Sequence, residues 1–68
     1  MKQFEIGDRV KCTMVWPGSS TAPEMIGKKG TVLDHDEMPD VEMDDPELNQ
    51  VNGHVVFYQE ELKLIEWF

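Results

Sequence analysis

The sequence predicts an all-β fold, a small five-stranded barrel that occupies residues 1–68 as one domain. Helical periodicity is nearly absent, and short apolar stretches alternate with turns rich in Gly, Pro, Asp and Asn. Five such stretches in about 60 residues fit a closed or nearly closed barrel. A chain this short buries only about 60% of its unfolded surface, so we expect a small core that recruits most large apolar side chains.

The first predicted strand covers residues 9–14, where apolar and polar side chains alternate. Its apolar face would carry Val10, Cys12 and Met14, which is typical of a strand with one buried side. Residues 16–25 contain two prolines, a glycine and two serines, so they form a loop. The second strand covers residues 28–35, and glycines at 27 and 30 suit a tight bend at its start.

The remaining elements follow from turn residues and β-branched runs. In chain order they are a proline-containing turn at 36–40, a strand at 41–43, a polar connection at 44–53 with a turn at Asn52-Gly53, a strand at 54–58, one helical or 3₁₀ turn at 59–62, and a closing strand at 63–66. The predicted core is Val10, Cys12, Met14, Val32, Val41, Val55, Phe57, Leu62 and Leu64. His35 and His54 are expected to face solvent.

Charge divides the chain into two parts. Fourteen acidic and six basic residues give a net charge of −8, and five of the basic residues lie within the first 29 positions. Phosphate-backbone binding needs Lys and Arg to displace counterions, so this balance argues against direct nucleic-acid binding. The single cysteine fits a reduced, cytoplasmic setting, and no segment is apolar enough to predict a signal peptide or a membrane span.

Three short segments carry a resemblance to a known family. They are Ile6-Gly7-Asp8-Arg9-Val10, Gly27-Lys28-Lys29-Gly30-Thr31-Val32 and the closing stretch from Tyr58 to Ile65. Together they resemble SH3-like small barrels of the KOW type, and the size and acidity are similar to small uncharacterised barrels encoded by bacteriophages. The resemblance implies an SH3-like barrel with one short 3₁₀ turn near the C-terminus.

KOW-type barrels often contact RNA, and the resemblance would place that contact at Lys28 and Lys29. The strand that follows continues into seven carboxylates between residues 34 and 45, which opposes that use. SH3 domains that bind proline-rich peptides have a groove lined by tyrosines and tryptophans. This chain has one tyrosine and no comparable aromatic run, so proline-peptide binding is not expected.

No catalytic, metal or cofactor site is predicted. The run from Asp34 fails the EF-hand pattern, because Met38 and Pro39 stand where the loop needs an oxygen ligand and glycine. A looser carboxylate site with Asp44 or Glu47 stays open. Cys12 is expected to be a small buried hydrophobe and not a nucleophile paired with a histidine.

The candidate binding residues fall into two sets. Aromatic and apolar candidates are Trp16, Pro17, Tyr58 and Trp67, and acidic candidates are Asp34, Asp36, Asp44 and Asp45. Exposed Trp and Tyr dominate interface energetics, so the first hypothesis is a non-catalytic protein-interaction module, as a monomer or homodimer. The resemblance implies a phage-encoded accessory or host-modulating protein. The alternatives are an acidic mimic of nucleic acid that inhibits a host enzyme and a KOW-like RNA-binding module.

Overall fold

A computed structural model describes residues 4–19, 21–49 and 53–65. Its strands are β1 (Arg9–Cys12), β2 (Lys29–His35), β3 (Pro39–Met43), β4 (Val55–Val56) and β5 (Leu62–Leu64). Three short 3₁₀ turns connect them, η1 (Pro23–Met25), η2 (Pro46–Leu48) and η3 (Gln59–Glu61). The all-β prediction is confirmed, and η3 lies where a helical or 3₁₀ turn was predicted. In the described residues no helix is long and apolar enough to cross a membrane.

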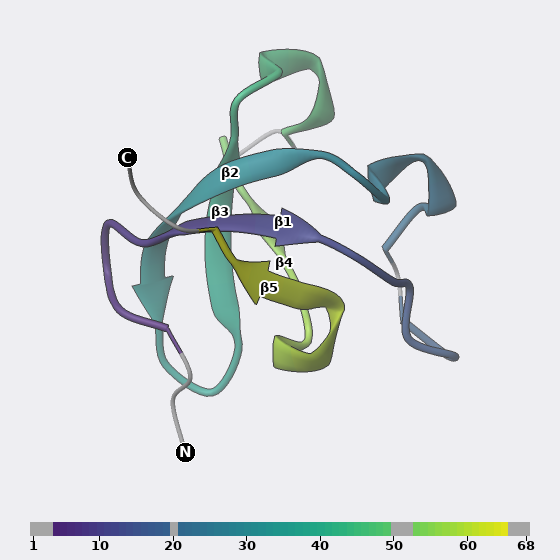
Figure 1. The fold of residues 1–68 in the computed structure, drawn as a ribbon, viewed down its shortest axis with the longest axis horizontal. Coiled ribbons are helices and arrows are strands. Elements are labelled where there is room, and N and C mark those ends of the chain that lie inside the picture. Colours follow the sequence, from purple (N-terminus) through teal and green to yellow (C-terminus); the bar gives the residue numbers. More distant parts are fainter. Residues whose placement is uncertain (1–3, 20, 50–52, 66–68) are drawn as a thin grey trace.

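The five strands form one antiparallel sheet in the order β4-β3-β2-β1-β5. The sheet is strongly curled, with β1 and β5 toward the viewer and β4 behind in Figure 1. Among the described residues, the strand pairings leave β4 and β5 as the two edges. Five antiparallel strands are therefore established, whereas the pairings do not close the sheet into the predicted barrel.

The buried side chains lie on the inner face of this curl. The predicted core residues that are buried are Val10, Cys12, Val32, Val41, Val55, Phe57 and Leu62. The prediction for Leu64 is wrong, because this residue lies on the edge strand β5 and is 57% exposed. Met14 lies beyond the end of β1 and is only half-buried. Phe4 and Met25 add to the core from segments where no core residue was predicted, and Met43 adds to it from β3, where Val41 was predicted.

An irregular register in β2 overturns the prediction that His35 faces solvent. The pairing of β2 with β3 shifts between Val32 and Asp34, and both Leu33 and Asp34 are exposed. Because the extra residue changes the phase of the alternation, the next side chain turns inward. His35 is therefore buried, packs against the Phe4 ring and contacts Gln59 Oε1 through Nε2 at 3.1 Å. His54 is half-buried, 3.8 Å from Asp40.

The two glycines before and within β2 have different roles. Gly27 has φ +89°, a conformation that other residues rarely adopt, so it forms the bend that leads into the strand. Gly30 has an ordinary φ, but a Cβ atom there would lie 2.5 Å from Val41 Cγ1 and 2.6 Å from the Glu42 carbonyl oxygen. The central strands approach so closely at this point that no side chain fits between them.

Candidate functional site

Trp16 is the first residue of a tight turn that follows β1. The Ser19 N–H donates to the Trp16 carbonyl at 2.9 Å, Pro17 supplies the second position, and Gly18 supplies φ +85° at the third. Proline followed by a residue of positive φ is the signature of a type II turn. The turn leaves the Trp16 side chain 43% exposed, and Pro17 is also exposed.

Like Trp16, Tyr58 is the residue at which a turn begins, because it directly precedes η3. Its backbone is extended and it precedes the turn, whose third residue is Glu61. The Tyr58 N–H donates to Glu61 Oε1 at 2.8 Å, while the Glu61 N–H donates to the Tyr58 carbonyl at 3.0 Å. Tyr58 is 39% exposed. We call Trp16 and Tyr58 the aromatic pair.

The carboxylate of Glu61 connects the two members of the aromatic pair. Glu61 is 0% exposed, and its Oε2 accepts the Trp16 N–H at 2.9 Å. Its Oε1 accepts the Thr21 hydroxyl at 3.1 Å in addition to the Tyr58 N–H. The backbone at two residues that are far apart in sequence is therefore held at one buried carboxylate, and a carboxylate acceptor forms stronger hydrogen bonds than a neutral one.

Sequence reasoning did not identify Glu61, which it treated only as part of a helical turn. A signal was present, because a Glu at the third residue of a helical turn commonly reaches back to the N–H of the capping residue. The contacts with Trp16 and Thr21 have no such local signal. They depend on a loop that is 40 or more residues away in the sequence.

Cys12 lies beside this carboxylate and is fully buried. Burial raises the pKa of the Cys12 thiol, the negative charge of Glu61 raises it further, and a hydrogen bond with the Met14 carbonyl opposes both. A raised pKa keeps the thiol protonated, which is opposite to the activation that a cysteine nucleophile needs.

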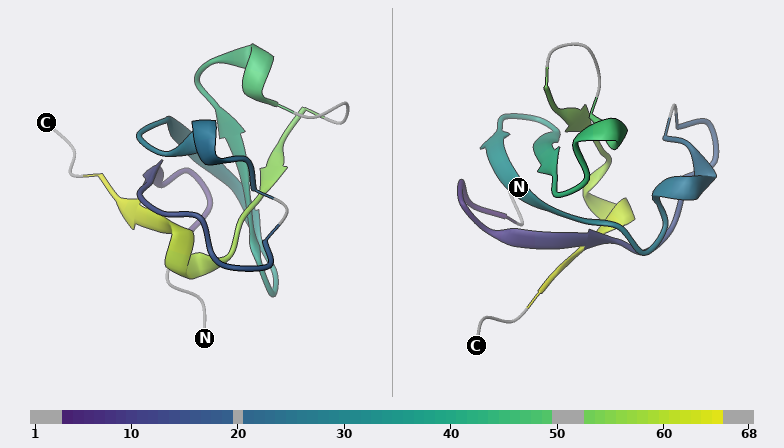
Figure 2. Two further views of the ribbon diagram at one scale, coloured as in Figure 1. Left: turned by 90° about the vertical axis from the view of Figure 1, so that its right-hand side faces the viewer. Right: turned by 90° about the horizontal axis from the view of Figure 1, so that it is seen from above.

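A groove of about 220 Å³ lies between η1, η2 and β4, next to Thr21. Figure 2 shows η1 and η2 near one another at the end of the sheet away from the β2–β3 turn. The apolar lining includes Met25, Leu48 and Val55, and the carboxylate-bearing residues Glu24 and Glu47 complete it. A groove of this composition suits an aliphatic side chain that ends in a positive charge.

The acidic candidates are spread over the molecule and mostly serve local contacts. Asp34 accepts the His35 N–H at 2.8 Å, and Asp45 caps η2 by accepting the Glu47 N–H at 3.1 Å. Asp36 is exposed in the turn between β2 and β3. None of these contacts involves Trp16 or Tyr58, so among the described residues the acidic candidates and the aromatic pair do not form one site.

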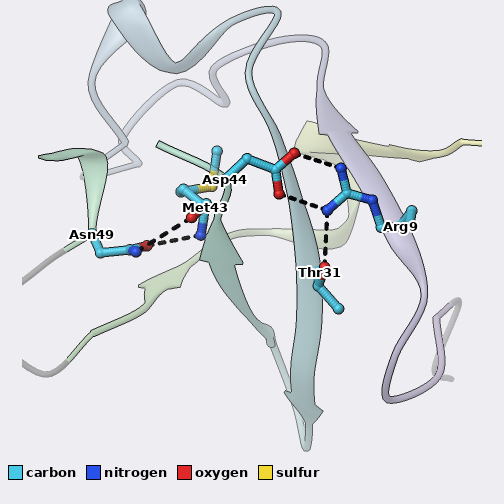
Figure 3. A network of polar contacts seen from close by, with 5 residues as sticks. All are labelled: Arg9, Thr31, Met43, Asp44 and Asn49. Carbon is cyan, nitrogen blue, oxygen red and sulfur yellow. Dashed lines mark hydrogen bonds and ion pairs between the residues drawn. The ribbon is translucent and has the colours of Figure 1, made fainter. Parts of the chain in front are cut away.

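Asp44 belongs to a network that joins three strands (Figure 3). Arg9 donates to both Asp44 oxygens, at 2.6 and 2.5 Å, and to the Thr31 hydroxyl at 2.9 Å. The hydrogen bond and charge of Arg9 lower the pKa of Asp44, and Lys29 adds to the effect. The only arginine of the chain is thus already paired with a carboxylate.

Within the described part of the chain, no three His, Cys, Asp or Glu residues come close enough to hold a metal ion. Asp44, which was left open as a possible ligand, uses both oxygens on Arg9. Trp67 lies outside the described residues.

Comparisons with protein-family models, curated proteins and solved structures found no match for this chain.

Proposed function

We propose that this chain is a non-catalytic protein-interaction module that binds a basic segment of a partner protein on the aromatic pair. The observation that carries the proposal is that the backbone N–H groups of Trp16 and Tyr58 both donate to the Glu61 carboxylate, although the two residues come from distant parts of the chain. Because the backbone at both residues is already ordered, binding costs less conformational entropy there, which favours affinity.

Charge supports a basic segment as the occupant. The chain has a net charge of −8, and exposed Glu60 lies on the same 3₁₀ turn that Tyr58 precedes. Arg and Lys side chains stack on Trp and Tyr rings, which contributes about 0.5–2 kcal/mol per contact. The groove that contains Glu24 and Glu47 offers a further position for one basic side chain.

The SH3-like resemblance agrees with this proposal at the level of element order, because a 3₁₀ turn lies between the last two strands.

The contacts of the acidic segment do not favour the nucleic-acid mimic. Three of its carboxylates accept hydrogen bonds from other residues of this chain, namely Asp34, Asp44 and Asp45. These contacts give the three carboxylates a structural role that needs no binding partner.

The test is binding of a short labelled peptide with arginine at alternate positions, measured by fluorescence anisotropy. Trp16→Ala should weaken binding by about 1–2 kcal/mol, which is about 5- to 30-fold in Kd, and Tyr58→Ala by somewhat less. Leu33→Ala is the control, because it removes an exposed apolar side chain from β2, away from the turn and η3. A peptide with glutamine in place of arginine should not bind.

Two results would contradict the proposal. Equal losses in Trp16→Ala and Leu33→Ala would show that the aromatic pair is not the binding site. Competition by DNA for the peptide, with no effect of either aromatic substitution, would instead support the nucleic-acid mimic. Retention of RNA by the chain in a filter-binding assay at about 50 mM salt would support the RNA-binding alternative.

A further inference from the structure

Three lysines from distant parts of the sequence lie side by side on the sheet. Lys11 of β1 is directly opposite Lys29 of β2 on one side and Lys63 of β5 on the other. Directly opposite residues share a face of the sheet, and adjacent strands are about 4.8 Å apart, so this lysine row is roughly 10 Å long at the backbone. All three side chains are exposed.

The lysine row lies on the outer face. Val10 and Cys12, on either side of Lys11 in β1, are both buried, and the side chains of a strand alternate between faces. Like charges directly opposite one another destabilise a sheet. In the described part of the chain, the ion pairs are Arg9–Asp44 and His54–Asp40, so none of the three lysines forms an ion pair. The charge of Lys29 acts on the nearby Asp44, whose two oxygens accept hydrogen bonds from Arg9. An anion provided by another molecule would relieve this repulsion.

We propose that the lysine row binds a short acidic segment of a protein. In an extended peptide, alternate side chains on one face are roughly 7 Å apart, so two carboxylates fit along the row. This surface is separate from the aromatic pair, and its ligand has the opposite charge. The proposal therefore goes beyond the function proposed above.

The surroundings of the lysine row favour an acidic peptide over a nucleic acid. On the same face, Arg9 and Thr31 form the next row, and neither offers an aromatic ring on which a base would stack. Arg9 already uses its guanidinium on Asp44, so it is not free for bidentate phosphate contacts. A long polyphosphate would also extend beyond the row toward Asp44, whose N–H donates to the Lys29 carbonyl, whereas two carboxylates of a short peptide fit within the row.

The experiment measures binding of a short labelled peptide with glutamate at every second position, by anisotropy at about 20 mM salt, where screening is weak. Lys11→Gln should raise Kd about three- to five-fold, as expected for the loss of one exposed ion pair. Lys28→Gln is the matched control. Its carbonyl accepts the Cys12 N–H, which places it opposite a buried residue and out of the row, and both variants change the net charge equally. Lys28→Gln should change Kd less than two-fold, or about 0.4 kcal/mol.

Stability provides a second readout, since Lys11→Gln removes a repulsion and should leave the free energy of unfolding unchanged or slightly higher. Trp16→Ala should bind the acidic peptide as the wild type does, so this test and that of the aromatic pair fail independently. The proposal is overturned if the peptide does not bind, or if Lys11→Gln and Lys28→Gln weaken binding equally. It is also overturned if a short single-stranded RNA binds more tightly than the peptide and loses affinity in Lys11→Gln.

Discussion

Two carboxylates join distant segments of this chain in contrasting ways. Glu61 is fully buried, and its partners are two backbone N–H groups and one hydroxyl, none of them charged. Asp44 has a side chain that is 52% exposed, and its partner is the guanidinium of Arg9. The first contact orders the loop and turn that carry the aromatic pair, whereas the second fastens the end of β3 to β1.

The contrast shows that a contact between opposite charges does not necessarily contribute more to the free energy of unfolding than a contact between a carboxylate and neutral donors. Removing an acceptor from a buried site leaves its donors unsatisfied, which costs about 1–3 kcal/mol for each donor. An exposed ion pair contributes about 0.2–1 kcal/mol because water and salt screen it. The contact without an opposite charge should therefore matter more for folding, and four predictions test this ranking.

The largest effect is expected for Glu61→Ala. The substitution leaves the N–H groups of Trp16 and Tyr58 and the Thr21 hydroxyl without their shared acceptor. Because water can reach the two partly buried N–H groups, the free energy of unfolding should fall by about 2–4 kcal/mol in urea titrations, less than three fully buried donors would cost. Labelling of Cys12, the single cysteine, should accelerate in parallel, because a buried thiol with a raised pKa reacts only after the structure opens. The control is Glu60→Ala, which removes an exposed carboxylate from the same turn. Equal losses in both variants would refute the role of Glu61.

Thr21→Val should have the next largest effect. It removes one of the three donors and keeps the shape of the side chain, so we expect a loss of about 1 kcal/mol. The Ser19 hydroxyl also donates a hydrogen bond to the Thr21 hydroxyl. A double-mutant cycle of Thr21→Val and Ser19→Ala measures the energy of that contact, and the rest of the loss in Thr21→Val belongs to the bond with Glu61. No loss in Thr21→Val would mean that the two backbone donors alone fix the carboxylate.

Asp44→Asn should destabilise the fold by only about 0.5–1 kcal/mol, and the loss should shrink as salt is added. Glu61→Ala should show no such salt dependence, because its donors are neutral. Urea titrations of both variants at low and high salt measure the difference. A loss in Asp44→Asn as large as that in Glu61→Ala would break the ranking.

The smallest effect is the pH dependence of the Arg9–Asp44 pair. The folded state lowers the pKa of Asp44, mainly through its hydrogen bond with Arg9. The contribution of the pair is therefore complete above the unfolded pKa of about 3.9 and is lost as the pH falls through the folded value. The stability difference between wild type and Asp44→Asn should narrow over this acidic range. A constant difference would show that the ionised form of Asp44 is not what stabilises the pair.

Local sequence patterns were sufficient for the strands but not for the contacts between them. The alternation from Arg9 to Met14 predicted a strand and its buried face, of which β1 covers Arg9–Cys12, and the run Gln59–Leu62 predicted η3. The register shift after Val32 has no local signal, so the inward turn of His35 could not be foreseen.

The sites depended even more on tertiary structure. Trp16 and Tyr58 were identified from residue type, but their link through Glu61 required the fold. The lysine row was not visible either, because Lys63 joins Lys11 only through the pairing of β5 with β1. A contact that depends only on the register between two strands cannot be predicted from the local sequence of either strand.

The close approach of the central strands at Gly30 has a consequence for how this sequence can vary. A library selected only for folding should reject every replacement at position 30, because a Cβ there meets the backbone of Glu42. Positions 28 and 29 are exposed, so the same selection should accept almost any residue in place of the two lysines. Within the stretch Gly27-Lys28-Lys29-Gly30, the fold therefore requires the two glycines but does not require the two lysines. If a selection for binding kept Lys29 but accepted other residues at position 28, the stronger retention of Lys29 would be due to binding and not to folding.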